Sequence, residues 1–525
     1  MNCTLERCKK HFKGEKDPMK RICSTLLALA MLCGTFALAA CGDKGTTTTT
    51  GGTNAPSAIS TGDGTEAITT EPEDYPDDIY TEGAGDRKPA GFENVDFNGK
   101  TFVFETPLDI KNGWDSYEVC VADENATDSL SMAIMRRNDV MAELYDCSIE
   151  QRADSEKTIQ SDFATDSCHV DIGALHWNVT DKGNGQYYNL ANYLNLDNPW
   201  WDQGYIRDMT VDNKLFSILG DFSLTSFDAT WALFFNKEVL QQNDKLKGYN
   251  FYDLVDNCQW TMDTFLEVIQ KAKQDDGDQV MTVGSGDIYG LVSSEYGITG
   301  LFYGGNSYVA KKTDDAAGNT TFSHGFDEHA ANVVDKIIRI YGDESVAIAN
   351  YRTVNTQINN GLTLFAPETL DKARNWSEDG LRNFGVLPYP AYSTEQIQTT
   401  GYSHYVVAHM IYTCVPTTIN YDLDIIWNFL ELYGYHSRYI VYPEYLNLYK
   451  YEYTNSEEDA HMVDVILSSR SFDLAYYGTW GSAENELWSG VKSNNNVVSS
   501  LGGEIGNVIL SKANEYKEMI SKVNN

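Results

Sequence analysis

A strand–helix–strand–helix–strand succession between residues 100 and 175 constrains the fold more than any other feature of this sequence. Strands are predicted at 100–105, 147–151 and 169–175, where short β-rich or apolar runs occur. Helices are predicted at 127–145 and 156–164; in the first, apolar residues recur at helical spacing. Strands that alternate with helices in this way form a parallel sheet covered by helices. The predicted fold class is therefore α/β.

The remainder of the chain predicts more elements of both kinds. The last hundred residues are expected to be mostly helical, with helix caps around Ser456. The other expected elements are strands at 214–220, 230–235 and 384–387, and helices that begin after Thr261, at 328–341 and at about Glu504.

Size and charge limit the organisation and the partners. A chain of 525 residues is too long for one ordinary core, so two lobes are expected. The net charge of −37 opposes binding to nucleic acid and to anionic lipid. The cysteines from Cys120 onward are five in number, widely scattered and without a CxxC pair, which favours free thiols over a disulfide scaffold or a zinc site.

The amino-terminal region has the pattern of a lipoprotein leader. A basic pair at 20–21 precedes an almost continuous small or apolar run at 26–40, which is short for a membrane span, and Cys41 follows two alanines. We expect residues 1–40 to be a signal peptide, with Met19 as the start, and Cys41 to carry a lipid. The alternative is a cleaved secretory signal whose cysteine is incidental. Residues 41–95 are then a flexible tether, because residues 42 to about 92 contain hardly any apolar residue.

Five short segments, in this order, resemble the carbohydrate-type (family 1) extracellular solute-binding proteins of ABC importers. They are 170–172 (VDI), 233–240 (LFFNKEVL), 260–265 (WTMDTF), Gly304-Gly305 and 385–390 (GVLPYP). The resemblance covers the chain from about residue 96 to its end. It implies a two-lobed periplasmic-binding-protein type 2 fold, with a ligand cleft between lobes that are joined by crossing strands.

The resemblance also implies lobe boundaries. Lobe 1 is expected to comprise 96–226 and 364–434, and lobe 2 is expected to comprise 227–363 and 435–525. The chain is expected to cross between the lobes near 222–230, to return near 362–366, and to cross a third time after the helix at 422–433. The segment 440–474 looks like the version found in clostridial-type lipoproteins of unassigned ligand, so the substrate of characterised relatives does not transfer.

Candidate ligand-binding residues follow from the same resemblance and from the chemistry of sugars, which bind flat apolar faces, carboxylates and amides. Each has a structural alternative: packing for the tryptophans and a hinge-turn cap for Asp228. Trp231 and Trp260 are expected in the core. The candidates are Trp177, Asn178, Trp201, Asp228, Glu295, Tyr296 and Trp480.

Catalytic patterns are sparse. The histidines show no HExxH or metal-ligand spacing, and there is no GxSxG motif, P-loop or EF-hand loop. Acidic pairs such as Asp275-Asp276 are expected to be solvated charge runs. We therefore expect a non-enzymatic protein without cofactor or metal.

The leading hypothesis is a monomeric, lipid-anchored binding protein on the extracellular face of the membrane. It would capture a mono- or oligosaccharide for ABC permease subunits and touch the membrane only through its anchor. Two alternatives are a surface-anchored enzyme that acts on polysaccharide and a ligand sensor for a membrane kinase.

Overall fold

The computed structural model describes residues 75, 78–107, 120–123, 125–176, 179–381, 383–408, 410–454 and 456–524. The expected signal peptide, Cys41, and Trp177 with Asn178 lie outside these residues. The described residues all belong to one compact unit, residues 71–525. Within the described part, no helix is both long enough and apolar enough to cross a membrane.

The first sheet confirms the predicted succession of strands and helices. Its strand order is β12-β3-β1-β2, in which β1, β2 and β3 are parallel and β12 is antiparallel to β3. Phe102 of β1 stacks on Phe429 of helix α13 with ring centroids 3.8 Å apart, so this helix covers the sheet. The strands are β1 (Lys100–Thr106), β2 (Cys147–Ala153), β3 (Ile172–Leu175) and β12 (Tyr412–Cys414).

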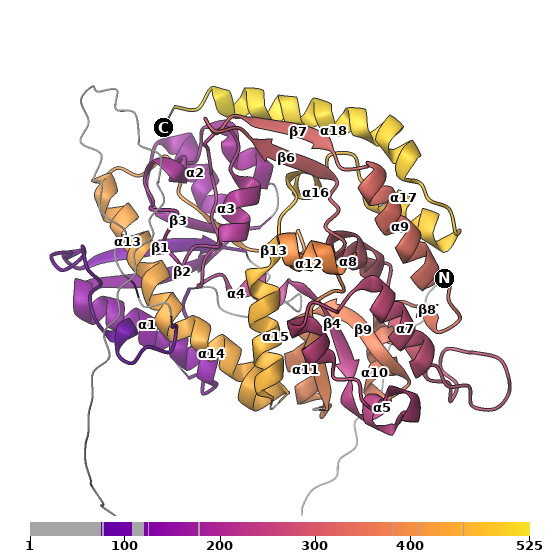
Figure 1. The fold of residues 1–525 in the computed structure, drawn as a ribbon. Helices are drawn as coiled ribbons and strands as arrows, with labels where there is room; N and C mark the ends of the chain where they lie inside the picture. Colours follow the sequence, from indigo (N-terminus) through magenta and orange to yellow (C-terminus); the bar gives the residue numbers. More distant parts are fainter. Residues whose placement is uncertain are drawn as a thin grey trace, which may run out of the picture. The chain divides into compact units, whose positions relative to one another are not determined.

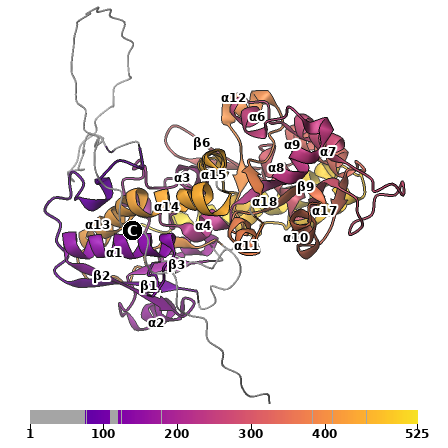
Figure 2. The ribbon, with the colours of Figure 1, turned by 90° about the horizontal axis from the view of Figure 1, so that it is seen from below.

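Helical segments from both halves of the chain lie beside this sheet (Figures 1 and 2). Two of them, η6 and η7, are π-helical and alternate with α13 and α14. The segments are η1 (Ala84–Asp86), α1 (Ser129–Tyr145), α2 (Lys157–Thr165), η3 (Val179–Asn184), η4 (Leu190–Asn192), α3 (Gln203–Met209), α13 (Leu423–His436), η6 (Ser437–Val441), α14 (Tyr442–Asn447) and η7 (Leu448–Tyr453).

The second sheet has the strand order β10-β4-β9-β5-β8. Strands β5, β8, β9 and β10 run in one direction and β4 runs against them. Phe365 of β9 lies within ring-contact distance of Trp260 and Phe265, which explains why the expected core residue Trp260 is fully buried. The strands are β4 (Trp231–Asn236), β5 (Tyr289–Ser293), β8 (Val346–Ile348), β9 (Thr363–Thr369) and β10 (Phe384–Leu387).

The remaining elements include the crossing helix α4, two small ladders, β6–β7 and β11–β13, and helices that pack on the second sheet or, as α18 does, on β7 and η3. The helix cap predicted at Thr261 is confirmed, because its hydroxyl accepts from the Thr264 N–H, and Ser456 caps α15 in the same way. The helices are α4 (Leu224–Asp228), α5 (Lys237–Gln242), η5 (Asp244–Leu246), α6 (Phe251–Asp256), α7 (Met262–Ala272), α8 (Tyr296–Gly304), α9 (Glu328–Tyr341), α10 (Tyr351–Asn359), α11 (Lys372–Glu378), α12 (Thr394–Thr400), α15 (Glu457–Ser468), α16 (Leu474–Tyr477), α17 (Ala483–Lys492) and α18 (Val498–Ser521). The ladder strands are β6 (Ala310–Asp314), β7 (Thr320–His324), β11 (His404–Tyr405) and β13 (Arg470–Ser471).

The chain passes from the first sheet to the second through residues 218–231. Ile218 bridges Thr413 of the first sheet, α4 follows, and the chain then enters β4 of the second sheet. The segment 362–366, expected as the return, instead lies in β9, the central strand of the second sheet. The chain returns later, between β10 and β12. The predicted assignment of 364–434 to lobe 1 is therefore corrected, since β9 and β10 hydrogen-bond with β4.

Two further expectations are corrected. Residues 214–220 form isolated bridges rather than a strand, because Lys214, Ile218 and Gly220 pair with three separate partners, Val211, Thr413 and Trp201. The tether was expected to reach residue 95, but residues 78–95 are described and Ala84 is fully buried. The Tyr435 hydroxyl donates to the Ala84 carbonyl, and His436 Nδ1 lies 2.9 Å from the Gly85 carbonyl oxygen, so this segment is held against α13.

The cysteine prediction is confirmed for the described part of the chain. Cys120, Cys147, Cys168, Cys258 and Cys414 are free thiols. Burial raises the pKa of Cys120, Cys147 and Cys414 to about 12, so these three thiols are unreactive at neutral pH.

Close packing beneath α8 gives a stability prediction. A Cβ at Gly300 would lie 2.1 Å from the Tyr389 ring, which is itself buried. G300A should therefore lower the free energy of unfolding by about 1–3 kcal/mol in urea denaturation. The matched control is G503A in the exposed part of α18, where a Cβ meets nothing within 4 Å. That variant should raise the stability by up to about 1 kcal/mol through helix propensity. Equal effects at both positions would contradict the packing.

Candidate functional site

The carboxyl ends of four strands share one edge of the second sheet. Because β5, β8, β9 and β10 run in one direction, the loops after Ser293, Ile348, Thr369 and Leu387 lie at that edge, together with the start of β4 at Trp231. Ligands of α/β sheets bind at the carboxyl ends of the strands. This edge is therefore the candidate site on the second sheet.

Apolar side chains are exposed at this edge. Tyr296 follows β5 and is 46% exposed, and Tyr351 follows β8 and is 56% exposed. Ile348 pairs with Ser293 in the register of β5 and β8, which places both loops side by side. Trp231 supports Tyr296 from below, with ring centroids 5.6 Å apart. We call this group of side chains the aromatic edge; it comprises Tyr296, Trp231, Ile348 and Tyr351.

The aromatic edge rests on a rigid layer of rings. Trp231 is buried, as predicted, and stacks on Tyr405 of β11 with an interplanar angle of 9°. Tyr405 in turn stacks on Tyr303 of α8. Trp488 of α17 meets Tyr296 edge-on at 5.1 Å. Because these rings come from four different elements, the exposed face of Tyr296 is fixed by the tertiary structure.

A cluster of buried charges adjoins the end of β9. Asp228, at the carboxyl end of the crossing helix α4, accepts a hydrogen bond from the Tyr445 hydroxyl at 2.9 Å and lies 3.8 Å from Arg374 of α11. Its main-chain carbonyl accepts from the Asp371 N–H, and Asp371 pairs with Lys372 at 2.7 Å. The second carboxylate oxygen of Asp228 is buried without a hydrogen bond.

Burial governs the titration of this cluster. It raises the pKa of Asp228 to about 7, against the attraction of Arg374, and raises the pKa of Glu368 to about 8, against that of Lys372. A carboxyl group that is largely protonated near neutral pH can donate as well as accept a hydrogen bond. Asp228 was expected to contact a ligand, and the structure places it beside α14, fully enclosed.

The other predicted site residues fall into two groups. Glu295 and Tyr296 lie together at the start of α8, and the Glu295 carboxylate pairs with Lys492 at 3.0 Å. Trp201 and Trp480 are buried, each less than 5% exposed, and their binding to a ligand stays a prediction. Trp480 packs against Phe322 and Tyr516, and Trp201 packs against Phe222. Trp177 and Asn178 follow β3, whose last residue is Leu175, and lie outside the described residues.

Sequence reasoning missed three residues of this region. Tyr351 follows a strand of only three residues, and Arg374 lies within a short helix, so no motif marked either one. Glu484 stands in the first turn of α17 and looks like an ordinary helix-start acid. The signal that could have found Tyr351 is an aromatic residue directly after a strand end, the same signal that selected Tyr296.

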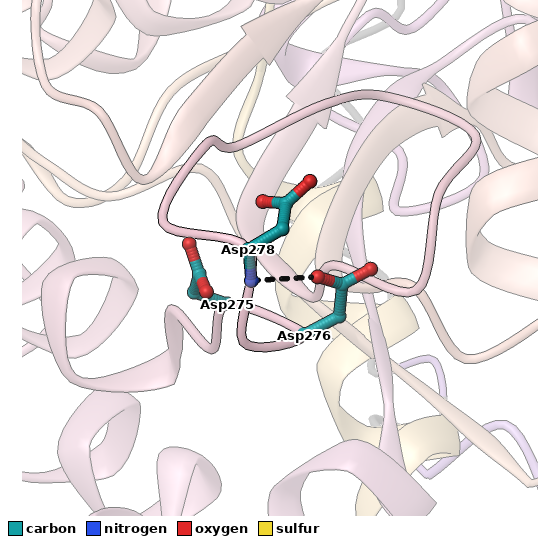
Figure 3. Close-up of side chains that lie close together, drawn as sticks. All are labelled: Asp275, Asp276 and Asp278. Carbon is teal, nitrogen blue, oxygen red and sulfur yellow. Dashed lines mark hydrogen bonds between the residues drawn. The ribbon is translucent and has the colours of Figure 1, made fainter.

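One acidic cluster lies elsewhere. The carboxylates of Asp275, Asp276 and Asp278 come within 4.8 Å of one another in an exposed loop after α7 (Figure 3). The Asp278 N–H donates to Asp276, and Asp275 accepts from the main-chain N–H groups of Gly277 and Gln279. The exposure agrees with the predicted solvated charge run, and the turn's own amides account for the geometry.

The two sheets joined by crossing segments define a two-lobed periplasmic-binding-protein fold. The structure of the cyclic alpha-maltosyl-1,6-maltose binding protein from Arthrobacter globiformis matches with a TM-score of 0.52 and 12% identity, over 78% of this chain and 98% of that one. The structure of M. tuberculosis UspC matches with a TM-score of 0.51 and 12% identity, over 78% and 99%. No family model and no curated sequence matches this chain. The likeness therefore establishes the fold.

The buried charge cluster gives a pH prediction. The pKa of Asp228 is raised from 3.8 to about 7 on folding, so the folded protein binds a proton more tightly than the unfolded chain. This group's stabilising contribution is complete below about pH 4 and is lost as the pH rises through about 7. D228N keeps the acceptor for Tyr445 but cannot ionise. Its stability relative to wild type should therefore rise with pH across this range, by at most about 1.4 kcal/mol per pH unit.

Urea unfolding at several pH values measures this difference. D379N, at an exposed residue just after α11, is the matched control and should keep a constant difference from wild type. A D228N difference that is independent of pH would mean that Asp228 is ionised throughout, which would contradict the burial argument.

Proposed function

We propose that this chain captures a carbohydrate, and specifically an oligosaccharide, outside the cell and delivers it to an ABC importer. The observation that carries the proposal is the aromatic edge at the carboxyl ends of β5 and β8. Sugar rings bind through their C–H faces to flat apolar surfaces, and Tyr296 offers such a face, held by Trp231. Two exposed tyrosines on neighbouring strand ends suit a ligand longer than one ring.

The fold supports capture between two lobes. The Arthrobacter protein of the same fold is named for binding a cyclic maltosyl-maltose. In the proposed function, the ligand lies between the two lobes and against the aromatic edge, and the lobes close over it by a hinge motion at the crossings. The buried cluster around Asp228 lies at the first crossing and would fix the position of the crossing helix relative to α11 and α14.

The anchor completes the proposed function. The apolar run at 26–40 and the small residues before Cys41 support a lipidated cysteine, and the polar residues that follow support a tether. An anchored binder stays close to its membrane partner, so modest affinity between the two is sufficient. The protein would then act as a monomer at the extracellular face of the membrane.

Titration calorimetry against neutral oligosaccharides tests the aromatic edge. Y296A should weaken binding by about tenfold or more, because it removes the stacking face, whereas Y296F should bind like wild type. Y80A is the matched control, since Tyr80 is 54% exposed but lines a separate cavity near Arg438. Undiminished binding by Y296A would place the ligand elsewhere. Lack of binding to any saccharide by wild type would refute carbohydrate capture.

Cell fractionation tests the anchor. The full chain should partition with membranes and acquire radiolabelled fatty acid, because Cys41 carries the lipid. C41S should be recovered without label, whereas C33S, inside the apolar run, should behave like wild type. Equal labelling of C41S and wild type would contradict lipidation at Cys41.

A further inference from the structure

A cavity of about 270 Å³ is lined in part by Glu484, which is linked through Thr299 and Trp488 to Tyr296 of the aromatic edge. A space of this size admits several water molecules or a single ring-sized group of a ligand. Its walls come from α16, from the turn that follows it and from the start of α17. The lining residues are Val309, Ala408, Ala475, Tyr476, Thr479, Ser482, Ala483, Glu484 and Asn485.

Glu484 is the acidic residue of this cavity, and its carboxylate has no charged partner among the described residues. The Thr299 hydroxyl donates to it at 3.0 Å, and no basic side chain of the described residues lies within 4 Å. Burial raises the pKa of Glu484 above its ordinary value, and the Thr299 hydrogen bond opposes that shift. A half-buried carboxylate is destabilised unless a cation or further donors approach it.

Thr299 connects this carboxylate to the aromatic edge. Tyr296 and Thr299 are three residues apart on α8 and therefore lie on one face of that helix. The Trp488 Nε1–H donates to the Thr299 hydroxyl at 2.9 Å, and the Trp488 ring contacts Tyr296. Two hydrogen bonds thus connect Trp488 through Thr299 to the carboxylate in the cavity, and a ring contact connects Trp488 to the exposed Tyr296.

The backbone of the cavity wall is unusual. Thr479, Gly481 and Ser482 have φ values of 51°, 106° and 47°, so three of four consecutive residues lie in the left-handed region. For threonine, a β-branched residue, this conformation is strained. Such strain persists only where surrounding contacts impose it, and it is concentrated at ligand sites. Thr479 and Ser482 of this turn line the cavity.

We propose that this cavity is the subsite for an amino-bearing ring of the ligand and that Glu484 selects the ammonium group. The inference rests on the proposed function and narrows it to amino-sugar oligosaccharides. An ammonium group supplies both the charge and the donors that the Glu484 carboxylate lacks. An acidic sugar is disfavoured there by the same carboxylate and by the net charge of −37.

Calorimetry with two β-1,4-linked tetrasaccharides tests this inference. Cellotetraose and the glucosamine tetramer share a backbone and differ by a hydroxyl or an ammonium group at C2. Wild type should bind the glucosamine tetramer at least about tenfold more tightly, as expected for a charge-assisted hydrogen bond. E484Q should abolish this preference while keeping its affinity for cellotetraose.

E486Q is the matched control, because Glu486 lies on the same helix turn, is exposed and does not line the cavity. It should keep the preference. Equal affinity of wild type for the two tetrasaccharides, or an unchanged preference in E484Q, would overturn the role of Glu484 and leave carbohydrate capture standing. If wild type binds neither of the two tetrasaccharides and no other saccharide, both proposals are overturned.

Discussion

The buried ion pair between Arg470 and Asp202 is the interaction on which the junction of the two sheets depends. Its atoms lie 2.6 Å apart, and both side chains are about 5% exposed. Asp202 caps α3 beside the first sheet, while Arg470 begins β13, which pairs with β11 on the return path. The same guanidinium donates to Ser226 of the crossing helix and lies over the Phe227 ring. Loss of either partner would leave a buried charge uncompensated, which is strongly destabilising.

Two more polar contacts connect the same crossing to the helical segment between 423 and 453, which alternates between α-helical and π-helical turns. Arg438 pairs with Asp221 at 3.0 Å, and Tyr445 binds Asp228. Arg438 lies in the π-helical segment η6, and Tyr445 lies in α14, just before η7. A π-helical turn shifts the register of the residues that follow it, and such turns are frequent at functional sites. Here the shifts occur where the helix passes the two crossing carboxylates.

Local pattern was sufficient to predict most of the framework. The strand at 384–387 and the helix at 328–341 have the predicted bounds, because their apolar spacing and turn signals are unambiguous. Long-range pairing was not predictable. Residues 362–366 look like a possible crossing strand, and only their hydrogen bonds to β4 and β5 show them to be the centre of a sheet. The burial of the tryptophans at 201 and 480 could not be predicted because composition does not record it.

The residues of the candidate site were likewise predictable from local pattern only in part. Tyr296 could be selected because it follows a strand, but its support by Trp231, Tyr405 and Trp488 joins four elements. Glu484 gains its distinction only from a cavity and from the absence of a nearby cation among the described residues. Such properties belong to the tertiary structure. They are also the properties that make a binding site selective.

The proposed capture mechanism depends on movement between the two sheets, and a distance measurement tests it most directly. Cys168 precedes β3 of the first sheet and Cys258 precedes α7 beside the second sheet; both are partly exposed, whereas the other three described thiols are buried. Spin labels on this pair, in the full chain with cysteines 3, 8, 23, 33 and 41 changed to serine, report their separation by pulsed dipolar spectroscopy. Addition of an oligosaccharide that binds should move the distribution of the distance between the two spin labels to one new population. The size of that population should follow the fraction of protein that has ligand bound. A distribution that stays unchanged while the sugar binds would contradict closure of two lobes over the ligand.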